Sequence, residues 1–297
     1  ALAQFASQVD VVTYEFENIP ADSVAVLEAN KPVYPSAQAL AVSQDRLDEK
    51  TFIAGLGLSV APFYDITSLD SLRQALDKTG GHGILKTRRL GYDGKGQWRV
   101  TPESDLKAIV QQLDGQPAIL EALIDFEREV SVVVARDRSG NIASYAPIEN
   151  VHENHILKHS TLPANLSPER SAQAAKLAES LIAALDYVGV LSIETFVTQA
   201  GLMVNEIAPR VHNSGHLTQD ACACGQFEQH IRAISGWPLG SPDAHSDAVM
   251  TNLLGDDIHD WQKWAAQPNT SLHLYGKDKA KAGRKMGHVT QLKIKSS

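Results

Sequence analysis

The chain has 297 residues, of which 43% are hydrophobic and 21% charged, and its formal net charge is −8 at pH 7. This length predicts two or three packed units, and the acidic balance disfavours general nucleic-acid binding, which requires clustered Lys and Arg. No apolar run approaches the ~20 residues of a membrane-spanning helix, so we expect no membrane segment. We expect the two cysteines, Cys222 and Cys224, to be reduced thiols of a cytoplasmic protein.

The first 44 residues show βαβ-like alternation. The expected elements are a strand at 10–16, a helix at 20–30 and a short extended piece at 32–36. A doubly wound domain usually opens with a strand and a glycine-rich turn, and neither precedes this pattern. We therefore expect the remainder of such a domain, in a truncated or incomplete protein.

The pattern changes after residue 37. The expected elements are a capped helix at 43–57, a helix at 68–80, a strand–loop–strand segment at 83–100 and a helix at 101–115. Ser104 or Thr101 is the expected cap of the last of these helices.

The second half of the chain is predicted to be rich in strands. The expected elements are strands at 117–123, 128–137 and 142–152, a helix at 168–186, a hairpin of 188–197 with 202–208, and short strands and loops over 248–292. The helix is the clearest of these, because its apolar residues recur at spacings of three and four.

A basic, glycine-rich loop joins the two strands of 83–100. Lys86 ends the first strand, and the loop contains Gly91, Gly94 and Gly96 together with Arg88, Arg89 and Lys95. Glycines let backbone N–H groups approach an anion while the cations neutralise it, so the loop is a candidate cover for nucleotide phosphates. A solvated basic hairpin is the alternative. The loop matches neither the P-loop nor the G-x-G-x-x-G pattern.

The hairpin at 188–208 carries two acids. With a turn at 199–201, Glu194 faces Glu206 across the strands, on one face with Phe196, Val204 and Leu202. Opposed carboxylates repel unless a positive charge lies between them, and Mg²⁺ is commonly held by one or two carboxylates plus substrate phosphates. Asn213 is a further oxygen donor. If the register is shifted by one residue, the two acids lie on opposite faces of the sheet instead.

The strongest motif follows directly, with NEIAPRVHNSGH at residues 205–216. Together with DVVTYEFENIP, SQDRLDEK, ILKTRRLGYDGKGQWRV, IETFV and AGRKMGH, it resembles the ATP-dependent 5-(carboxyamino)imidazole ribonucleotide synthases, an ATP-grasp family of purine biosynthesis. The motifs stand in the family's order over nearly the whole chain.

This resemblance implies the reaction of ATP, bicarbonate and aminoimidazole ribonucleotide through carboxyphosphate, with Mg²⁺ (or Mn²⁺), in a homodimer. It implies ATP contacts for Arg46, Lys86, Gly91, Tyr92, Asp93, Gly94, Lys95, Gly96, Gln97, Glu121, Ala122, Leu123, Ile124, Glu129, His152, Asn205 and Glu206. It implies a metal at Glu194, Glu206 and Asn213, and catalytic roles for Arg210, His212 and Asn213. The implied ribonucleotide contacts are Tyr92, Arg210, His212, Ser214, Arg284 and Lys285.

The implied fold is α/β with an α+β lid, an ATP-grasp architecture. We expect the remnant of a doubly wound domain at 1–44, a lid at 45–121 and a large domain with the metal and substrate sites at 122–297. The family's usual opening turn and C-terminal end are absent, and His155 replaces a usual glycine. The alternatives are the formate-dependent glycinamide ribonucleotide transformylase, a biotin carboxylase-like subunit and a non-catalytic ATP-binding fragment.

Overall fold

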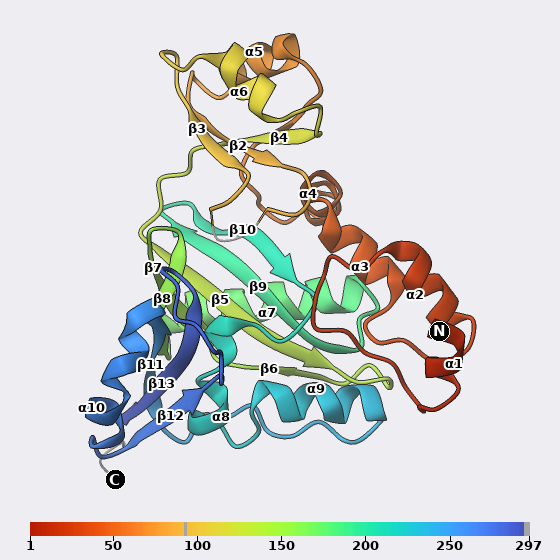
Figure 1. The fold of residues 1–297 in the computed structure, drawn as a ribbon, viewed down its shortest axis with the longest axis vertical. Helices are drawn as coiled ribbons and strands as arrows, with labels where there is room; N and C mark the ends of the chain where they lie inside the picture. The colour runs from red at the N-terminus through yellow and green to blue at the C-terminus, as the bar shows by residue number, and fades with distance from the viewer. Residues whose placement is uncertain (92–93, 294–297) are drawn as a thin grey trace.

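The structure is a computed structural model and describes residues 1–91 and 94–293 (Figure 1). Tyr92 and Asp93, both predicted to contact ligands, lie outside the described residues. The helices are α1 (Leu2–Ala6), α2 (Ala21–Glu28), α3 (Ala37–Gln44), α4 (Arg46–Gly55), α5 (Leu69–Lys78), α6 (Leu106–Gln112), α7 (Pro168–Ala184), α8 (Thr218–Ala221), α9 (Gln226–Ser235) and α10 (Trp261–Ala265), with 3₁₀ turns at Asn213–Gly215 and Gly255–Asp260. The strands are β1 (Phe63–Ile66), β2 (Gly83–Thr87), β3 (Gln97–Val100), β4 (Ala118–Ala122), β5 (Arg128–Arg136), β6 (Ile142–Ser144), β7 (Ile148–Glu153), β8 (Ile156–Leu162), β9 (Gly189–Thr198), β10 (Gly201–Ala208), β11 (Asp247–Leu254), β12 (Thr270–Leu274) and β13 (Lys285–Lys293).

A small unit is built on an antiparallel sheet. Within the described residues this sheet has four strands in the order β1-β4-β2-β3, and its core includes residues of α5 such as Leu72. Helix α5 begins at a capping box in which Ser68 and Ser71 satisfy each other's backbone N–H groups. The unit stands above the rest of the molecule in Figure 1, with α5 and α6 on the far side of the sheet from the large domain.

The large unit is built on a second sheet. In the described part of the chain it has nine strands, in the order β10-β9-β5-β7-β8-β11-β13-β12, with β6 paired to β5. Both faces of β5 are buried: Val132 packs in one core with Leu181 of α7, and Val133 packs in another with Leu217. Burial on both faces explains why β5 is a continuous run of β-branched residues.

The expected strand at 10–16 is not formed. Among the described residues, its β contact is one isolated parallel bridge between Val12 and Val33. The segment is instead held by its side chains, because Val12, Tyr14 and Val33 pack in a small core with Val24 of α2.

The expected helix at 43–57 is two helices. Asp45 is extended between α3 and α4, with φ −124° and ψ 117°, and its side chain caps α4 by accepting from Leu47 N at 3.0 Å. Arg88 and Arg89 also bind the Asp45 carboxylate, at 2.8 and 3.3 Å, so contacts from the glycine-rich loop favour the break.

Three other local predictions were wrong. Helix α6 is capped by Asp105, which accepts from two backbone N–H groups, instead of by Ser104 or Thr101. The expected strand at 142–152 is split into β6 and β7 near Pro147, which has no N–H to continue a ladder. The tail holds two long strands, β11 and β13, where short ones were expected. In the described residues, no helix is both long and apolar enough to cross a membrane.

Candidate active site

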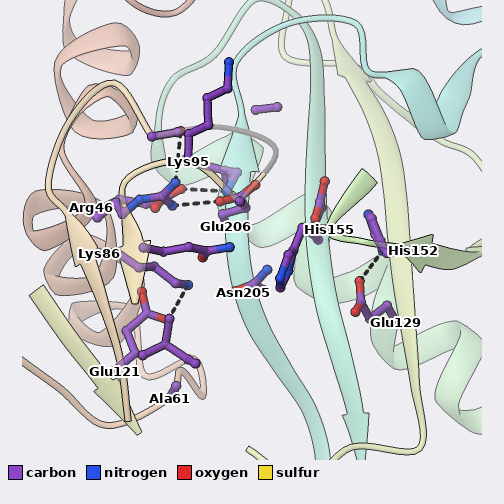
Figure 2. Close-up of a pocket in the computed structure, with 18 of the residues that line it drawn as sticks. Arg46, Ala61, Lys86, Lys95, Glu121, Glu129, His152, His155, Asn205 and Glu206 are labelled. Carbon is purple, nitrogen blue, oxygen red and sulfur yellow. Dashed lines mark hydrogen bonds and ion pairs between the residues drawn. The ribbon is translucent and has the colours of Figure 1, made fainter. Parts of the chain in front are cut away.

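A cavity of about 740 Å³ lies between the two sheets and the N-terminal helices. Its lining comes from segments far apart in the sequence: the loop before α2, the start of α4, β2 and β4 of the small sheet, β9 and β10 of the large sheet, the loop at 210–213, and the start of β13. Figure 2 shows side chains of the two sheets pointing toward one another across it.

A buried charge cluster lies at the wall formed by β2, β4 and α4. Lys86 Nζ lies 3.0 Å from Glu121 Oε2 (Figure 2). Lys50 Nζ, from a side chain 1% exposed, lies 3.5 Å from the same oxygen. Burial alone would raise the pKa of Glu121, but the two ammonium groups hold it below its usual value. Lys50 also donates to the backbone oxygen of Asn205 at 2.6 Å, and so ties α4 to β10.

The two acids of the hairpin are cross-strand partners, as predicted: Glu206 pairs with Glu194. The predicted set of neighbours on that face was partly wrong. A β-bulge between Val204 and Glu206 inserts Asn205, so Asn205 and Glu206 both face the cavity while Val204 is buried in the core with α7. Leu202 packs on that same core.

Each acid has a cationic or potentially cationic neighbour. Arg46 Nη1 lies 2.9 Å from Glu206 Oε2, as Figure 2 shows, and His212 Nε2 lies 3.1 Å from Glu194 Oε1. Burial would raise the pKa of Glu206, but Arg46 outweighs it and the pKa falls to about 2. Glu206 is therefore a carboxylate at neutral pH.

Asn213 supplies a third set of oxygen-donor atoms near these acids. It lines the same cavity, and its amide oxygen and nitrogen are buried without a hydrogen-bond partner among the described residues. Two carboxylates and an orphaned amide oxygen are the donor set that Mg²⁺ accepts, so the residues present fit such an ion.

A buried chain of hydrogen bonds holds His212 in place. Ser214 Oγ lies 2.9 Å from His212 Nδ1 and accepts a hydrogen bond from Ser131 at 2.8 Å. Asn150 donates to Ser131 at 2.9 Å, and Ser160 donates to Asn150. With Nδ1 held by Ser214, Nε2 of the imidazole is directed at Glu194.

Arg210 is fixed from the N-terminal segment. Its guanidinium forms an ion pair with Glu17, including a bond from Nη2 to Oε1 at 3.1 Å, and Nη1 donates to the backbone oxygen of Val211. Burial would raise the pKa of Glu17, and the bond from Arg210 outweighs it and lowers the pKa. In the same cavity, His152 Nδ1 lies 2.7 Å from Glu129 Oε2 (Figure 2).

The glycine-rich loop borders the cavity and is constrained at its glycines. Gly94 and Gly96 have φ of 79° and 68°. A β-carbon on Gly96 would lie 2.7 Å from Thr87 Oγ1, so only glycine fits without displacement. The backbone oxygen of Gly91 accepts from Arg46 Nη2 at 3.2 Å, which links the loop to the residue that also binds Glu206.

Comparison with known proteins decides the family. The ATP-grasp domain model matches residues 51–227, the ribonucleotide synthetase preATP-grasp domain matches residues 1–44, and the phosphoribosylaminoimidazole carboxylase C-terminal domain matches residues 248–296. The N5-carboxyaminoimidazole ribonucleotide synthase of Brucella melitensis is 52% identical over 296 residues, which are 99% of this chain and 82% of that protein. The chain belongs to the N5-carboxyaminoimidazole ribonucleotide synthase family.

Solved structures of N5-carboxyaminoimidazole ribonucleotide synthases agree. An ADP complex superposes with a TM-score of 0.94 at 41% identity, covering 98% of this chain and 78% of that one. The enzyme of Aspergillus clavatus in complex with ADP and 5-aminoimidazole ribonucleotide superposes with a TM-score of 0.89 at 30% identity, covering 98% of this chain and 78% of that one. The predicted ATP-grasp fold is thereby confirmed.

Most residues predicted for this synthase site line the cavity. They are Arg46, Lys86, Gly91, Gly94, Lys95, Gln97, Glu121, Ala122, Leu123, Ile124, Glu129, His152, Glu194, Asn205, Glu206, Arg210, His212, Asn213 and Lys285. Three others do not line it. Gly96 contacts Thr87, Ser214 is fully buried behind His212, and Arg284 is exposed and donates to the backbone oxygen of Lys279 at 2.9 Å.

Sequence reasoning missed several lining residues of the synthase cavity, namely Glu17, Asn18, Ser43, Gln44, Glu49, Ala61, Phe126, Phe196 and His155. Glu17 and Asn18 lie in the DVVTYEFENIP motif, and Ser43, Gln44 and Glu49 lie in SQDRLDEK, so the motifs themselves were the available signal. Phe126 and Phe196 stack with ring centroids 4.5 Å apart, and no pattern in the sequence pairs them.

Proposed function

We propose that this chain catalyses the ATP- and bicarbonate-dependent carboxylation of 5-aminoimidazole ribonucleotide to N5-carboxyaminoimidazole ribonucleotide, in purine biosynthesis. The observation that carries this proposal, beside family membership, is one cavity that joins three groups of residues. They are the cations Arg46 and Lys86 next to a glycine-rich loop, the opposed acids Glu194 and Glu206, and a separate cation at Lys285.

In the first step, a bicarbonate oxygen attacks the γ-phosphorus of ATP, the bond to the β-phosphate oxygen breaks, and ADP leaves. Bicarbonate is a weak nucleophile and both reactants are anions, so binding and charge stabilisation carry most of the catalysis. Lys86 and Arg46 bind the phosphates and lower the repulsion, and the loop at 91–97 covers them. The segment 121–124 binds adenine, and Glu129 binds the ribose.

Glu194, Glu206 and Asn213 would hold Mg²⁺ (or Mn²⁺), which would supply positive charge to neutralise the charge that develops on the phosphate oxygens. Arg210 and His212 lie beside these three residues in the cavity lining. In our proposal they orient bicarbonate, because each is already held by a carboxylate: Arg210 by Glu17, and His212 by Glu194.

In the second step, the exocyclic amine of the ribonucleotide attacks the carboxyl carbon of carboxyphosphate, or CO₂ released from it in place. The C–N bond forms, inorganic phosphate leaves, and the amine loses a proton. Carboxyphosphate hydrolyses readily, so the glycine-rich loop must exclude water until the amine has reacted. Lys285, which lines the same cavity, binds the 5′-phosphate of the ribonucleotide.

A domain division at residues 44 and 121, a homodimer and a cytoplasmic location belong to the proposal as well. The location is supported by Cys222 and Cys224, which are free and buried thiols, as is usual in a reducing compartment. Sedimentation velocity at two protein concentrations tests the dimer.

The deciding experiment measures ADP release from ATP and bicarbonate, with and without 5-aminoimidazole ribonucleotide. Glycinamide ribonucleotide plus formate is the parallel arm, since the related transformylase also forms an acyl phosphate. We expect stimulation by aminoimidazole ribonucleotide alone. Stimulation by the formate pair alone moves the chain to the other ligase, and stimulation by neither identifies a nucleotide-binding fragment.

A further inference from the structure

A second cluster of polar side chains lies outside the cavity described above, where α8 meets the β12–β13 hairpin. Asp220 of α8, His273 of β12 and His288 of β13 each offer one possible ligand atom, and these atoms lie within 4.8 Å of one another. None of the three belongs to the cavity lining in the described residues. We propose that Asp220, His273 and His288 form a binding site for one divalent transition-metal ion of the zinc class.

The state of His288 is the first argument for a bound ion. Its side chain is 2% exposed, and its Nδ1 lies 2.7 Å from the hydroxyl of Tyr275. Its Nε2 is buried and has no hydrogen-bond partner among the described residues. A buried nitrogen left without a partner costs free energy. A metal ion at Nε2 removes that cost, with Nδ1–H donating to Tyr275 in the arrangement usual for a ligating histidine.

The second argument is the geometry of the other two residues. His273 Nε2 lies 3.0 and 3.2 Å from the two carboxylate oxygens of Asp220, and the rings of His273 and His288 stack with centroids 4.4 Å apart. Ligands of a tetrahedral zinc ion at about 2.0–2.1 Å stand roughly 3.3 Å from each other. The Asp220–His273 pair is already near that spacing. Because the two imidazole planes are within 15° of parallel, one ring must rotate for both nitrogen lone pairs to reach one ion. His273 is one-third exposed, which gives an ion its entry path.

The ligand set defines the class of metal. Two imidazoles and one carboxylate suit zinc and its neighbours, whereas Mg²⁺ and Ca²⁺ require oxygen ligands. Three protein ligands leave one position of a tetrahedral ion for water.

The position of the cluster gives the ion a structural consequence. Helix α8 follows the loop that carries His212 and Asn213, and β13 begins at Lys285. His216, between the loop and α8, packs on His288 with ring centroids 5.1 Å apart. An ion held by α8, β12 and β13 therefore ties the loop at one end of the cavity to the strand that begins with Lys285.

Cobalt(II) titration of the chelator-treated, dialysed full chain tests the proposal, because bound Co²⁺ reports itself by its visible absorption. The titration is run in excess Mg²⁺, and Zn²⁺ is then added as competitor. We expect one Co²⁺ per chain, displaced by Zn²⁺. His273→Ala should abolish the absorption, and since His273 is partly exposed this variant should fold. Tyr275→Phe should weaken binding about 10- to 100-fold.

Two control variants separate this site from others. His259→Ala removes an exposed histidine near Asp256 and should leave Co²⁺ binding unchanged. Glu206→Gln, which alters the cavity, should also leave it unchanged. Absence of stoichiometric Co²⁺ binding, or binding that survives His273→Ala and is lost in Glu206→Gln, overturns the proposal.

Discussion

Glu49 is a buried carboxyl group whose ionisation should lower the free energy of unfolding above neutral pH. It lies on α4, its side chain is 2% exposed, and one of its oxygens accepts from the backbone N–H of Ile207 at 2.6 Å. Burial, and after it the nearby charge of Glu206, raise the pKa of Glu49 to about 8, although Lys50 opposes them. Glu49 is therefore largely protonated in the folded protein at pH 7.

The sign of the pH effect follows from proton counting. Between pH 6 and 9 an unfolded glutamate is ionised, because its ordinary pKa is 4.5, while folded Glu49 keeps its proton up to about pH 8. The folded state binds more protons, so its free energy of unfolding falls as pH rises. At about 1.36 kcal/mol per pKa unit, the loss from pH 6 to pH 9 is roughly 2–3 kcal/mol. With roughly 2.1 cal/mol/K of unfolding entropy per residue, this corresponds to about 4 °C of melting temperature.

Glu49→Gln tests this reasoning, because an amide has the shape of the protonated carboxyl group, accepts the same bond from Ile207 and does not titrate. The melting temperatures of the variant and the parent are measured by calorimetry at pH 6, 7, 8 and 9 without nucleotide or added metal. Titration of all other groups cancels in the difference between the two proteins. We expect that difference to shift in favour of the variant by about 4 °C from pH 6 to pH 9. A difference that stays constant, or that shifts in favour of the parent, refutes the raised pKa.

Three substitutions test the proposed catalytic residues. Glu206→Gln removes one charge from the proposed metal site and should lower kcat by on the order of 10²-fold or more, with an unchanged circular dichroism spectrum; near-normal turnover contradicts the metal role. Lys285→Ala should raise the KM for the ribonucleotide about 10- to 100-fold, which is the effect of one charged hydrogen bond, and should raise the KM for ATP far less. Arg284→Ala alters an exposed side chain and should change both KM values less than Lys285→Ala does. Gly96→Ala places a β-carbon 2.7 Å from the hydroxyl of buried Thr87 and should lower kcat/KM for ATP. Gly115 has a similar positive φ, but no atom lies within 4 Å of the position that a β-carbon would take, so Gly115→Ala should leave kcat/KM unchanged. Equal activities of the two glycine variants would show that the loop tolerates displacement.

Local signals in the sequence predicted much of the secondary structure. The helix expected at 168–186 is α7, Pro168–Ala184, because Ser167 caps it and its apolar face matches the sheet beneath. The strand–loop–strand segment at 83–100 is β2 and β3 with Gln97 paired to Lys86. These elements depend on neighbours within a few residues, which is the range over which a sequence pattern acts.

The pairing of Glu194 with Glu206 was predicted correctly by a reasoning that was wrong in two places. The turn is one residue shorter than expected, because Gly201 pairs with Thr198. The bulge at Asn205 then shifts the register by one residue in the compensating direction. The bulged backbone oxygen accepts from Lys50 of α4, a contact between residues 155 positions apart. No local pattern contains that contact, so neither the bulge nor the burial of Val204 on the opposite face could be predicted.

The same limit explains the missed partners of the predicted site residues. Arg210 and His212 were identified by their motif, but Glu17 and the buried chain through Ser131 and Asn150 come from other elements. Residue type identified the groups that we propose to contact the substrates, whereas the groups that orient these side chains depend on packing between elements.

The partners of the opposed acids also determine how the cavity accepts anionic substrates. Glu194 and Glu206 would repel each other across the hairpin, but Arg46 lies beside Glu206 and His212 lies beside Glu194, so side chains of the protein itself contact both acids. In the proposed reaction Arg46 would also bind the phosphates, and Glu194, Glu206 and Asn213 would hold the metal ion. Glu206 would then exchange the guanidinium of Arg46 for the metal, and the guanidinium would bind the phosphates instead. Such an exchange leaves no buried charge without a counter-charge, which is the condition for a deeply charged site to be stable with and without its substrates.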